Sequence, residues 1–343
     1  MVKLVFVERK PINPKTTQER PVVGVIEALT VGFDRVRRQP WLMIIPLVLD
    51  LFLWIGPRLE AQPLYAQVEP DLKSISANLD TDGKLAVQDV SDLLKDFLSH
   101  YNLFSWLSVG VVGVPAVNTT IDATAPLVTG TAPVNLPVSD VGAYLGVAIS
   151  LSAVGLLLGG LFWALLTLPQ RAEPFNLSVW LINGLAVGRQ LLVLAVVTAI
   201  SGLVLMFPLS IVMALIGTIS LGLASFLPAL LITGIVWVIF YLAFTVHGLA
   251  LYRLPLTRAV RISALIARVY FVSTLGLATL SIVIYVGLGV VWELFTPDSW
   301  LRLIAMAGNA FITASLASAS LIYYQNRSTI LAERLNLPQL SNF

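Results

Sequence analysis

The most constraining feature of the chain is a run of 63 residues, 190–252, that contains no Asp, Glu, Lys or Arg. A single helix of this length would measure about 95 Å, roughly three times the thickness of the hydrocarbon core of a bilayer. The run therefore predicts two membrane-spanning helices, near 190–215 and 227–250, joined by a tight turn. The Gly and Pro residues of the segment 217–228 are typical of such a turn.

Composition extends this interpretation to the whole chain. Of the 343 residues, 57% are hydrophobic and only 12% are charged, whereas soluble proteins average about 25% charged residues. This imbalance argues against a soluble protein and predicts an all-α, polytopic integral membrane protein. Four further windows, almost free of charge, raise the expected number of transmembrane helices to about six: 39–57, 141–170, 269–292 and 303–326. The segment 103–117 has only 15 residues and is expected to be interfacial or folded back.

The distribution of basic residues predicts the orientation. Sixteen Lys and Arg residues lie on one side of the predicted spans, in segments 1–40, 171–189, 253–268 and 327–343, and five lie on the other side. The side that is richer in Lys and Arg normally faces the cytoplasm. We therefore expect a multi-pass protein of the cell membrane with both termini in the cytoplasm and residues 58–140 outside.

Three segments that precede spans have the apolar spacing of amphipathic helices, namely 22–38, 176–190 and 254–268. Each is followed by two predicted spans, which suggests an elbow helix and two spans repeated three times. The alternative is that any basic loop between spans has this appearance. The expected organisation is a tail, an elbow with the first span, an extracytoplasmic helical insertion, a bundle of five further spans with their elbows, and a second tail: 1–21, 22–57, 58–140, 141–326 and 327–343.

The third elbow carries a wider similarity. Its sequence with the end of the preceding span is VHGLALYRLPLTRAVRISALIAR, residues 246–268, in which a Pro-containing turn precedes a basic helix. This pattern resembles the membrane domain that is attached to some bacterial glycerophosphodiester phosphodiesterases, and related stand-alone bacterial membrane proteins of unknown function. The resemblance covers about 22–56 and 141–325 and implies a six-span bundle. The catalytic domain of those enzymes is absent here, and the insertion at 58–140 departs from the pattern, so the resemblance implies no activity for any residue.

The clearest local motif lies in the insertion, where residues 78–89 read NLDTDGKLAVQD. This pattern resembles an EF-hand or dockerin calcium loop, because a hard cation requires several oxygens that converge from one tight turn. The ligands would be the side chains of Asn78, Asp80, Asp82 and Asp89 and the carbonyl of Lys84. The alternative is an ordinary Asp-Gly turn in which Asp80 or Asp82 caps the following helix. The sequence leaves both interpretations open.

Asp50 is the clearest carboxylate within a predicted span. An ionisable group at this depth is energetically expensive and is a functional candidate by default. The alternatives are a position near the outer interface, a helix cap, or pairing with Arg58 or Arg302. By contrast, His247 is expected to be a hydrogen-bonded interfacial residue, and Asn309 is expected to form hydrogen bonds between helices.

Several classes of function have no support in the sequence. The chain has no cysteine, which excludes disulfides and thiolate chemistry, and its net charge of +2 argues against nucleic acid as a partner. No common catalytic or nucleotide-binding motif occurs. We therefore expect a non-enzymatic scaffold or accessory protein, with the lipid bilayer and a protein at the insertion as partners and calcium as the candidate cofactor. The alternative function is a transporter or channel that uses Asp50.

Overall fold

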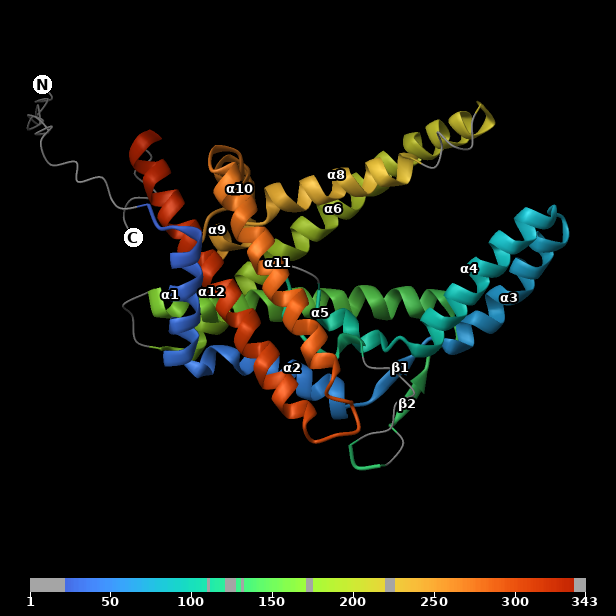
Figure 1. Ribbon diagram of the computed structural model, residues 1–343, viewed down its shortest axis with the longest axis horizontal. Coiled ribbons are helices and arrows are strands. Elements are labelled where there is room, and N and C mark those ends of the chain that lie inside the picture. Colours follow the sequence, from blue (N-terminus) through green and yellow to red (C-terminus); the bar gives the residue numbers. More distant parts are fainter. Residues whose placement is uncertain are drawn as a thin grey trace, which may run out of the picture.

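The computed structural model describes residues 22–109, 112–120, 128–130, 133–170, 175–219 and 226–335. Within these residues the chain is helical apart from two short strands and the connecting turns (Figure 1). The helices are α1 (Val25–Arg38), α2 (Ile44–Ile55), α3 (Gln62–Ala77), α4 (Thr81–His100), α5 (Val141–Thr167), α6 (Leu177–Ile219), α8 (Phe226–Leu242), α9 (Thr245–Tyr252), α10 (Leu256–Val269), α11 (Phe271–Glu293) and α12 (Arg302–Leu335). The strands β1 (Arg58–Glu60) and β2 (Asn135–Pro137) pair in parallel, and the 3-10 helices are η1 (Pro40–Met43), η2 (Leu103–Leu107), η3 (Asn118–Thr120) and η4 (Leu168–Gln170).

Among the described residues, five helical segments are long and apolar enough to cross a membrane: α5, most of α6, α8 together with α9, α11 and α12. A sixth is obtained only if α1 and α2, which meet at an angle of 98°, are counted as one broken span. The structure therefore confirms the predicted all-α architecture, with five or six helical segments that are long and apolar enough to cross a membrane. The predicted tight turn lies partly outside the described residues.

The expected first span at 39–57 differs in the structure. Helix α2 has 12 residues, which gives a length of about 18 Å, too short to cross a bilayer alone. The chain breaks at Gln39, whose φ of −133° and ψ of 69° are not helical. Proline at position 40 disfavours helical geometry in the residue before it. The amphipathic segment 22–38 and the apolar segment after it therefore form two helices at a steep angle.

Only the first and third elbows are separate helices, and the third ends at Val269, before the non-helical residue Tyr270. The third elbow is the separate helix α10, which begins immediately after Pro255. The second expected elbow, 176–190, is instead continuous with its span in the 43-residue helix α6. No proline lies between residues 177 and 207 to break the hydrogen-bond ladder. The predicted threefold elbow arrangement is thus correct for the first and third segments and wrong for the second.

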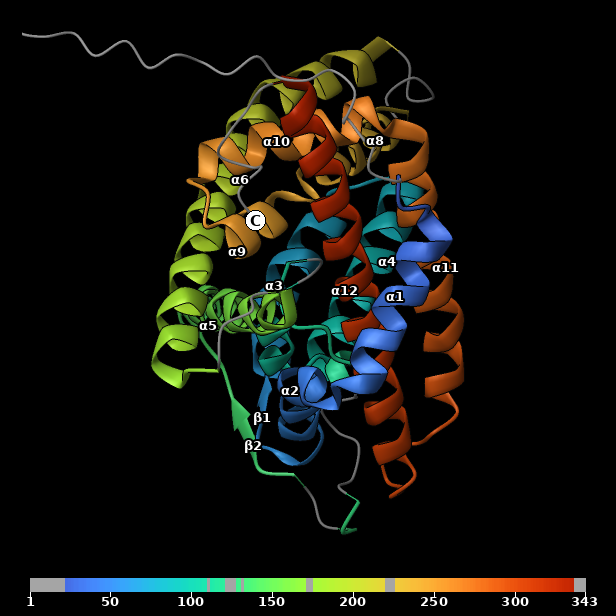
Figure 2. The ribbon, with the colours of Figure 1, turned by 90° about the vertical axis from the view of Figure 1, so that its left-hand side faces the viewer.

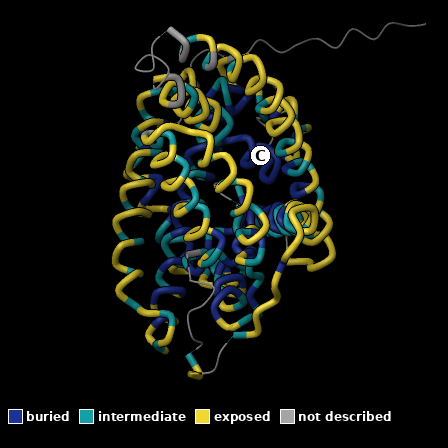
Figure 3. The backbone as a smooth tube through the Cα atoms, turned by 90° about the vertical axis from the view of Figure 1, so that its right-hand side faces the viewer, coloured by how far each residue is buried: buried dark blue, intermediate teal, exposed yellow. Residues whose placement is uncertain are grey.

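Helix α12 occupies the centre of the described fold, with half of its most apolar window buried. It lies beside α1 (Figure 2) and also contacts α2, α10 and α11. Close packing with α1 occurs at Gly32, because a Cβ at this position would lie 2.6 Å from the Ala319 nitrogen and 2.7 Å from the Ser315 oxygen. Buried residues concentrate in the centre of the fold, while the outer helices are largely exposed (Figure 3).

Small residues also bring α5 and α6 together. Gly160 of α5 lies directly against Gly184 and Gly188 of α6. Gly155 and Gly159 instead face the backbone of the segment 103–117, which folds back along α5 as η2 and a loop. The expected folding back of this segment therefore occurs, and its contact surface is a row of glycines rather than lipid.

We expect Gly32→Ala to lower the free energy of unfolding by about 1–3 kcal/mol, because the added methyl group overlaps backbone atoms of α12 that have no room to move. The measurement is unfolding of the full chain in mixed micelles, followed by tryptophan fluorescence. Gly202→Ala in α6 is the matched control, since a Cβ there meets nothing within 4 Å. In that helix alanine is favoured over glycine, so a loss of stability in the control as large as at Gly32 would contradict the packing argument.

Helices α3 and α4 form a hairpin that projects from the bundle (Figure 1). Leu64 of α3, Leu98 of α4 and Leu103 of η2 are buried together at its base. The hydroxyls of Tyr65 and Ser91 join the two helices at 2.9 Å. Below the hairpin, the Asn102 side chain accepts from the backbone nitrogens of Leu59 and Phe104. The first half of the predicted insertion is therefore helical and is attached to the bundle through the strand pair.

Candidate functional site

Asp50 lies on α2 and its residue surface is completely buried. Asn118, the first residue of η3, holds it from the loop that returns along α5. The Asn118 backbone nitrogen donates to Oδ1 of Asp50 at 2.8 Å, and the Asn118 side-chain Nδ2 donates to the Asp50 carbonyl at 2.9 Å. One asparagine therefore contacts both the side chain and the backbone of the aspartate, which fixes the loop onto α2.

Arg302 completes this arrangement from the start of α12. Its Nε donates to Oδ1 of Asn118 at 2.8 Å, and its Nη1 donates to the carbonyls of Trp292 at 3.1 Å and Phe295 at 2.8 Å. The carbonyls at the end of a helix lack intrahelical partners and attract a cation. The guanidinium thus joins the end of α11 to the loop, and we call Asp50, Asn118 and Arg302 the Asp50 network.

The Asp50 network contains a buried negative and a buried positive group that are bridged by a neutral amide. Asn118 is 2% exposed and Arg302 is 4% exposed. The predicted pairing of Asp50 with Arg302 is therefore present in an indirect form, with Asn118 between the two charges. Arg58, the other expected partner, is buried in β1. A charge removed from water is tolerated best when it is compensated and hydrogen-bonded, and here Asn118 binds one carboxylate oxygen of Asp50 and connects it to Arg302.

One oxygen of the Asp50 carboxylate takes no part in these hydrogen bonds. Oδ2 of Asp50 is buried without a hydrogen-bond partner, and so is Nδ2 of Asn309 on α12. The Asn309 amide lies close enough to the Asp50 carboxylate to interact with it electrostatically, but the two side chains do not form a hydrogen bond. The hydrogen bonds between helices that were expected of Asn309 are therefore not formed by its side-chain nitrogen.

The end of α2 is held by a second buried contact. Trp54 is 1% exposed, and its indole nitrogen donates to the Pro297 carbonyl at 2.6 Å. Its ring meets that of Trp300 edge to face, with centroids 5.8 Å apart. The loop between α11 and α12 is therefore attached to α2 at two points, the Asp50 network and Trp54.

His247 lies on α9 in the core rather than at an interface, which corrects the expectation from the sequence. It is 3% exposed, and its Nε2 lies 2.7 Å from the Ser320 hydroxyl. Its ring packs against Trp163 of α5 at a centroid distance of 4.8 Å and against Tyr324 of α12 at 5.6 Å. The position follows from the break at Phe244, after which the eight residues of α9 are all buried. A serine hydroxyl and aromatic rings make this a packed polar contact.

The residues of the predicted calcium loop adopt a different geometry. Asn78 ends α3, and Asp80 is the N-cap of α4, where its side chain accepts from the Gly83 nitrogen at 3.0 Å. Asp82, Lys84 and Asp89 lie within α4, which begins at Thr81. The twelve-residue loop is therefore wrong as a backbone conformation, and the alternative of a helix cap at Asp80 is correct.

No group of three or more His, Cys, Asp or Glu side chains that could hold a metal ion occurs within the described residues. The helix directs the backbone carbonyl of Lys84 along its own axis, as in any α-helix. Calcium binding at 78–89 stays a prediction that is supported by the sequence pattern alone.

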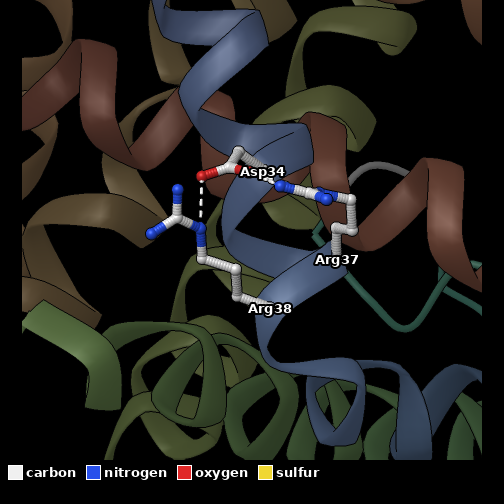
Figure 4. A network of polar contacts seen from close by, with 3 residues as sticks. All are labelled: Asp34, Arg37 and Arg38. Carbon is white, nitrogen blue, oxygen red and sulfur yellow. Dashed lines mark hydrogen bonds and ion pairs between the residues drawn. The ribbon is translucent and has the colours of Figure 1, made fainter.

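A small charge cluster lies at the C-terminal end of α1, next to the break before α2. Asp34 is within 2.6 Å of Arg37 Nη2 and within 2.7 Å of Arg38 Nε (Figure 4). Both arginine side chains are largely exposed. Exposed pairs of this kind contribute little to stability, so the cluster serves to position two basic groups at the end of an amphipathic helix.

The sequence did not identify Asn118 as part of a site, and it named Arg302 only as one of two partners for Asp50. Comparison with known proteins adds no relative, since no family, no curated protein and no solved structure matches the chain. The function is therefore argued from the geometry of the chain itself.

Proposed function

We propose that this chain is a non-enzymatic, multi-pass membrane protein that acts as a scaffold or accessory subunit. The observation that carries the proposal is the Asp50 network, in which the one clear intramembrane carboxylate is buried and fixed by groups of the chain itself. A transported ion or substrate would have to reach this carboxylate. Its hydrogen bonds instead hold α2, the loop at 112–120, α11 and α12 in one arrangement, which is a structural task.

The distribution of exposed apolar surface supports this proposal. Helix α6 and the following helix α8 extend away from the bundle (Figure 1) and have long apolar faces. Only 6% of the α6 window and 17% of the α8–α9 window are buried within the chain. A large apolar surface of this kind is covered by lipid or by another membrane protein. The exposed apolar surface of α6 and α8 is thus available for the lateral contacts that an accessory subunit would make.

The alternative function, a transporter or channel that uses Asp50, has one observation in its favour. Oδ2 of Asp50 and Nδ2 of Asn309 are buried neighbours without hydrogen-bond partners. Unsatisfied polar atoms in an interior are unusual and are often completed by water or a ligand. If these atoms line an aqueous path, water-soluble reagents should reach them.

Because the chain contains no cysteine, single cysteines can distinguish the two functions. We expect Asn309→Cys in sealed vesicles to resist a membrane-impermeant maleimide applied from either side, and to react after unfolding in detergent. Asp96→Cys on the exposed surface of α4 is the positive control. Labelling of Asn309→Cys within about tenfold of the control rate, with the fold intact, would show water access and favour transport.

A further inference from the structure

Helix α4 carries a row of apolar residues that are half or largely exposed, and Tyr101 stacks on the last of them, Phe97, at a centroid distance of 4.7 Å. Val90, Leu93 and Phe97 are 55%, 71% and 47% exposed. Their spacing of three and four residues places them on one face of the helix. Leu94 and Leu98 point about 100° away from this face and pack with α3 at the base of the hairpin. We call Val90, Leu93 and Phe97 the α4 stripe.

An acidic row accompanies the α4 stripe. Asp89, Asp92 and Asp96 each precede one residue of the stripe in sequence, so they lie beside it, on the side that faces away from α3. All three are exposed. Asp96 has His100 as a local partner at 3.1 Å, whereas Asp89 and Asp92 form no ion pair within the described residues. The surface is therefore apolar along one edge and negative along the next.

The basic residues of α4 are placed elsewhere. The ammonium group of Lys95 lies over the Tyr65 ring, 5.9 Å from its centroid, and so faces α3. Helical geometry puts Lys84 on the same side as Lys95, roughly opposite the α4 stripe. The acidic row is consequently not neutralised by the cations of its own helix, and it retains its charge for a partner.

We propose that the α4 stripe binds an amphipathic helix of another protein, whose apolar face is flanked by Lys and Arg. Two apolar helix faces bury each other in water, and the acidic row selects a basic partner and excludes an acidic one. A second copy of α4 would bring acidic rows close to each other, and an anionic bilayer would be repelled. This proposal names the partner class for the accessory role proposed above and rests on that role.

The test uses two synthetic helical peptides with the same apolar heptads, one flanked by Lys and the other by Glu. The full chain is held in nanodiscs of neutral phosphatidylcholine, and empty nanodiscs measure binding to lipid. We expect fluorescence anisotropy to show binding of the Lys peptide that is at least about tenfold tighter than binding of the Glu peptide. Equal affinities would overturn the proposal.

Two variants locate the binding. Leu93→Asp should weaken binding of the Lys peptide by about tenfold or more. Gln88→Asp adds the same charge on the opposite face of α4 and should change the affinity for this peptide by less than about twofold. The double variant Asp89→Lys with Asp92→Lys should reverse the preference toward the Glu peptide. Leu93 is largely exposed, so its substitution leaves the packed face of the hairpin intact, which circular dichroism verifies.

Other occupants of the stripe give different results. A dimer that mass photometry detects and that Leu93→Asp dissociates would show that a second copy covers the surface, and would overturn the proposal. A fluorophore on Leu93→Cys that is quenched by lipid-borne quenchers would place the stripe in the bilayer, with the same consequence. Neither result depends on labelling of Asn309→Cys, so failure of this proposal is distinguishable from failure of the proposed function.

Discussion

Replacing Arg302 with Met is expected to lower the free energy of unfolding by about 3–5 kcal/mol, as is usual when one partner of a buried charge pair is removed. The guanidinium is buried and donates to Asn118 and to the carbonyls of Trp292 and Phe295. Methionine fills a similar volume but donates nothing. Asp50 is then left in an apolar interior without a compensating charge, and the four acceptors of the guanidinium, which include the Val117 carbonyl, each lose a donor. Unfolding of the full chain in mixed micelles measures the difference from wild type.

Two further variants separate charge from packing. Arg302→Lys keeps the charge but loses the planar fork that reaches several acceptors, so its stability should fall between those of wild type and Arg302→Met. The double variant Asp50→Asn with Arg302→Met should be more stable than the sum of the single effects implies, by at least about 1 kcal/mol, because the uncompensated charge is gone. A loss below about 1 kcal/mol for Arg302→Met, or strictly additive effects, would show that the Asp50 network does not stabilise the fold.

The parts of the fold that follow from local sequence were predictable. Apolar runs of membrane length indicated the long helices, and the amphipathic spacing of 22–38 and 254–268 indicated α1 and α10. Both of these helices are bounded by proline, at positions 40 and 255, which acts on the residues beside it. The segment 176–190 has the same apolar spacing but continues unbroken into its span, whereas α10 ends at Val269 although no proline follows it there. Amphipathic spacing alone therefore indicated a helix and not where that helix would end.

The residues around Asp50 could not be assembled in this way. Asn118 is 68 positions from Asp50 and 184 positions from Arg302, and no periodicity connects residues at such separations. Nothing in the sequence around Asn118 marked this residue as buried. Only the return of the loop along the glycines of α5 places Asn118 against α2. Long-range contacts of this kind are decided by tertiary packing.

The motif at 78–89 shows a different limit. A calcium loop and a helix N-terminus both begin with closely spaced Asp and Asn residues, because side-chain oxygens can coordinate a metal ion or accept hydrogen bonds from free backbone nitrogens. Asp80 uses its oxygen for the nitrogen of Gly83. The sequence pattern places side-chain oxygens at this turn. The helical conformation of the residues that follow provides the free backbone nitrogen that Asp80 binds.

Orientation in the membrane depends on how the bent pair of α1 and α2 is counted. With this pair as one broken span there are six crossings, and both termini lie on the same side; without it there are five, and the termini lie on opposite sides. Two of the five basic residues counted on the outer side, Arg58 and Arg302, are buried in the fold. Buried cations do not interact with lipid headgroups, so the bias toward the cytoplasmic side is larger than the count of residues suggests.

We therefore expect the six-crossing arrangement, with residue 334 in the cytoplasm and the α3–α4 hairpin outside. In sealed right-side-out vesicles, an impermeant maleimide should label Asp96→Cys and Asp298→Cys almost completely. It should label Glu27→Cys, at the start of α1, only after the membrane is permeabilised. The three positions are exposed in the fold, so differences in labelling report the side of the membrane. The same cysteine variants in inside-out vesicles should show the reverse pattern of labelling. Labelling of Glu27→Cys together with Asp96→Cys in intact right-side-out vesicles would show that α1 and α2 do not form a crossing, because only these two helices lie between the two positions. A short helix buried against α12 would then satisfy its apolar face without spanning the bilayer.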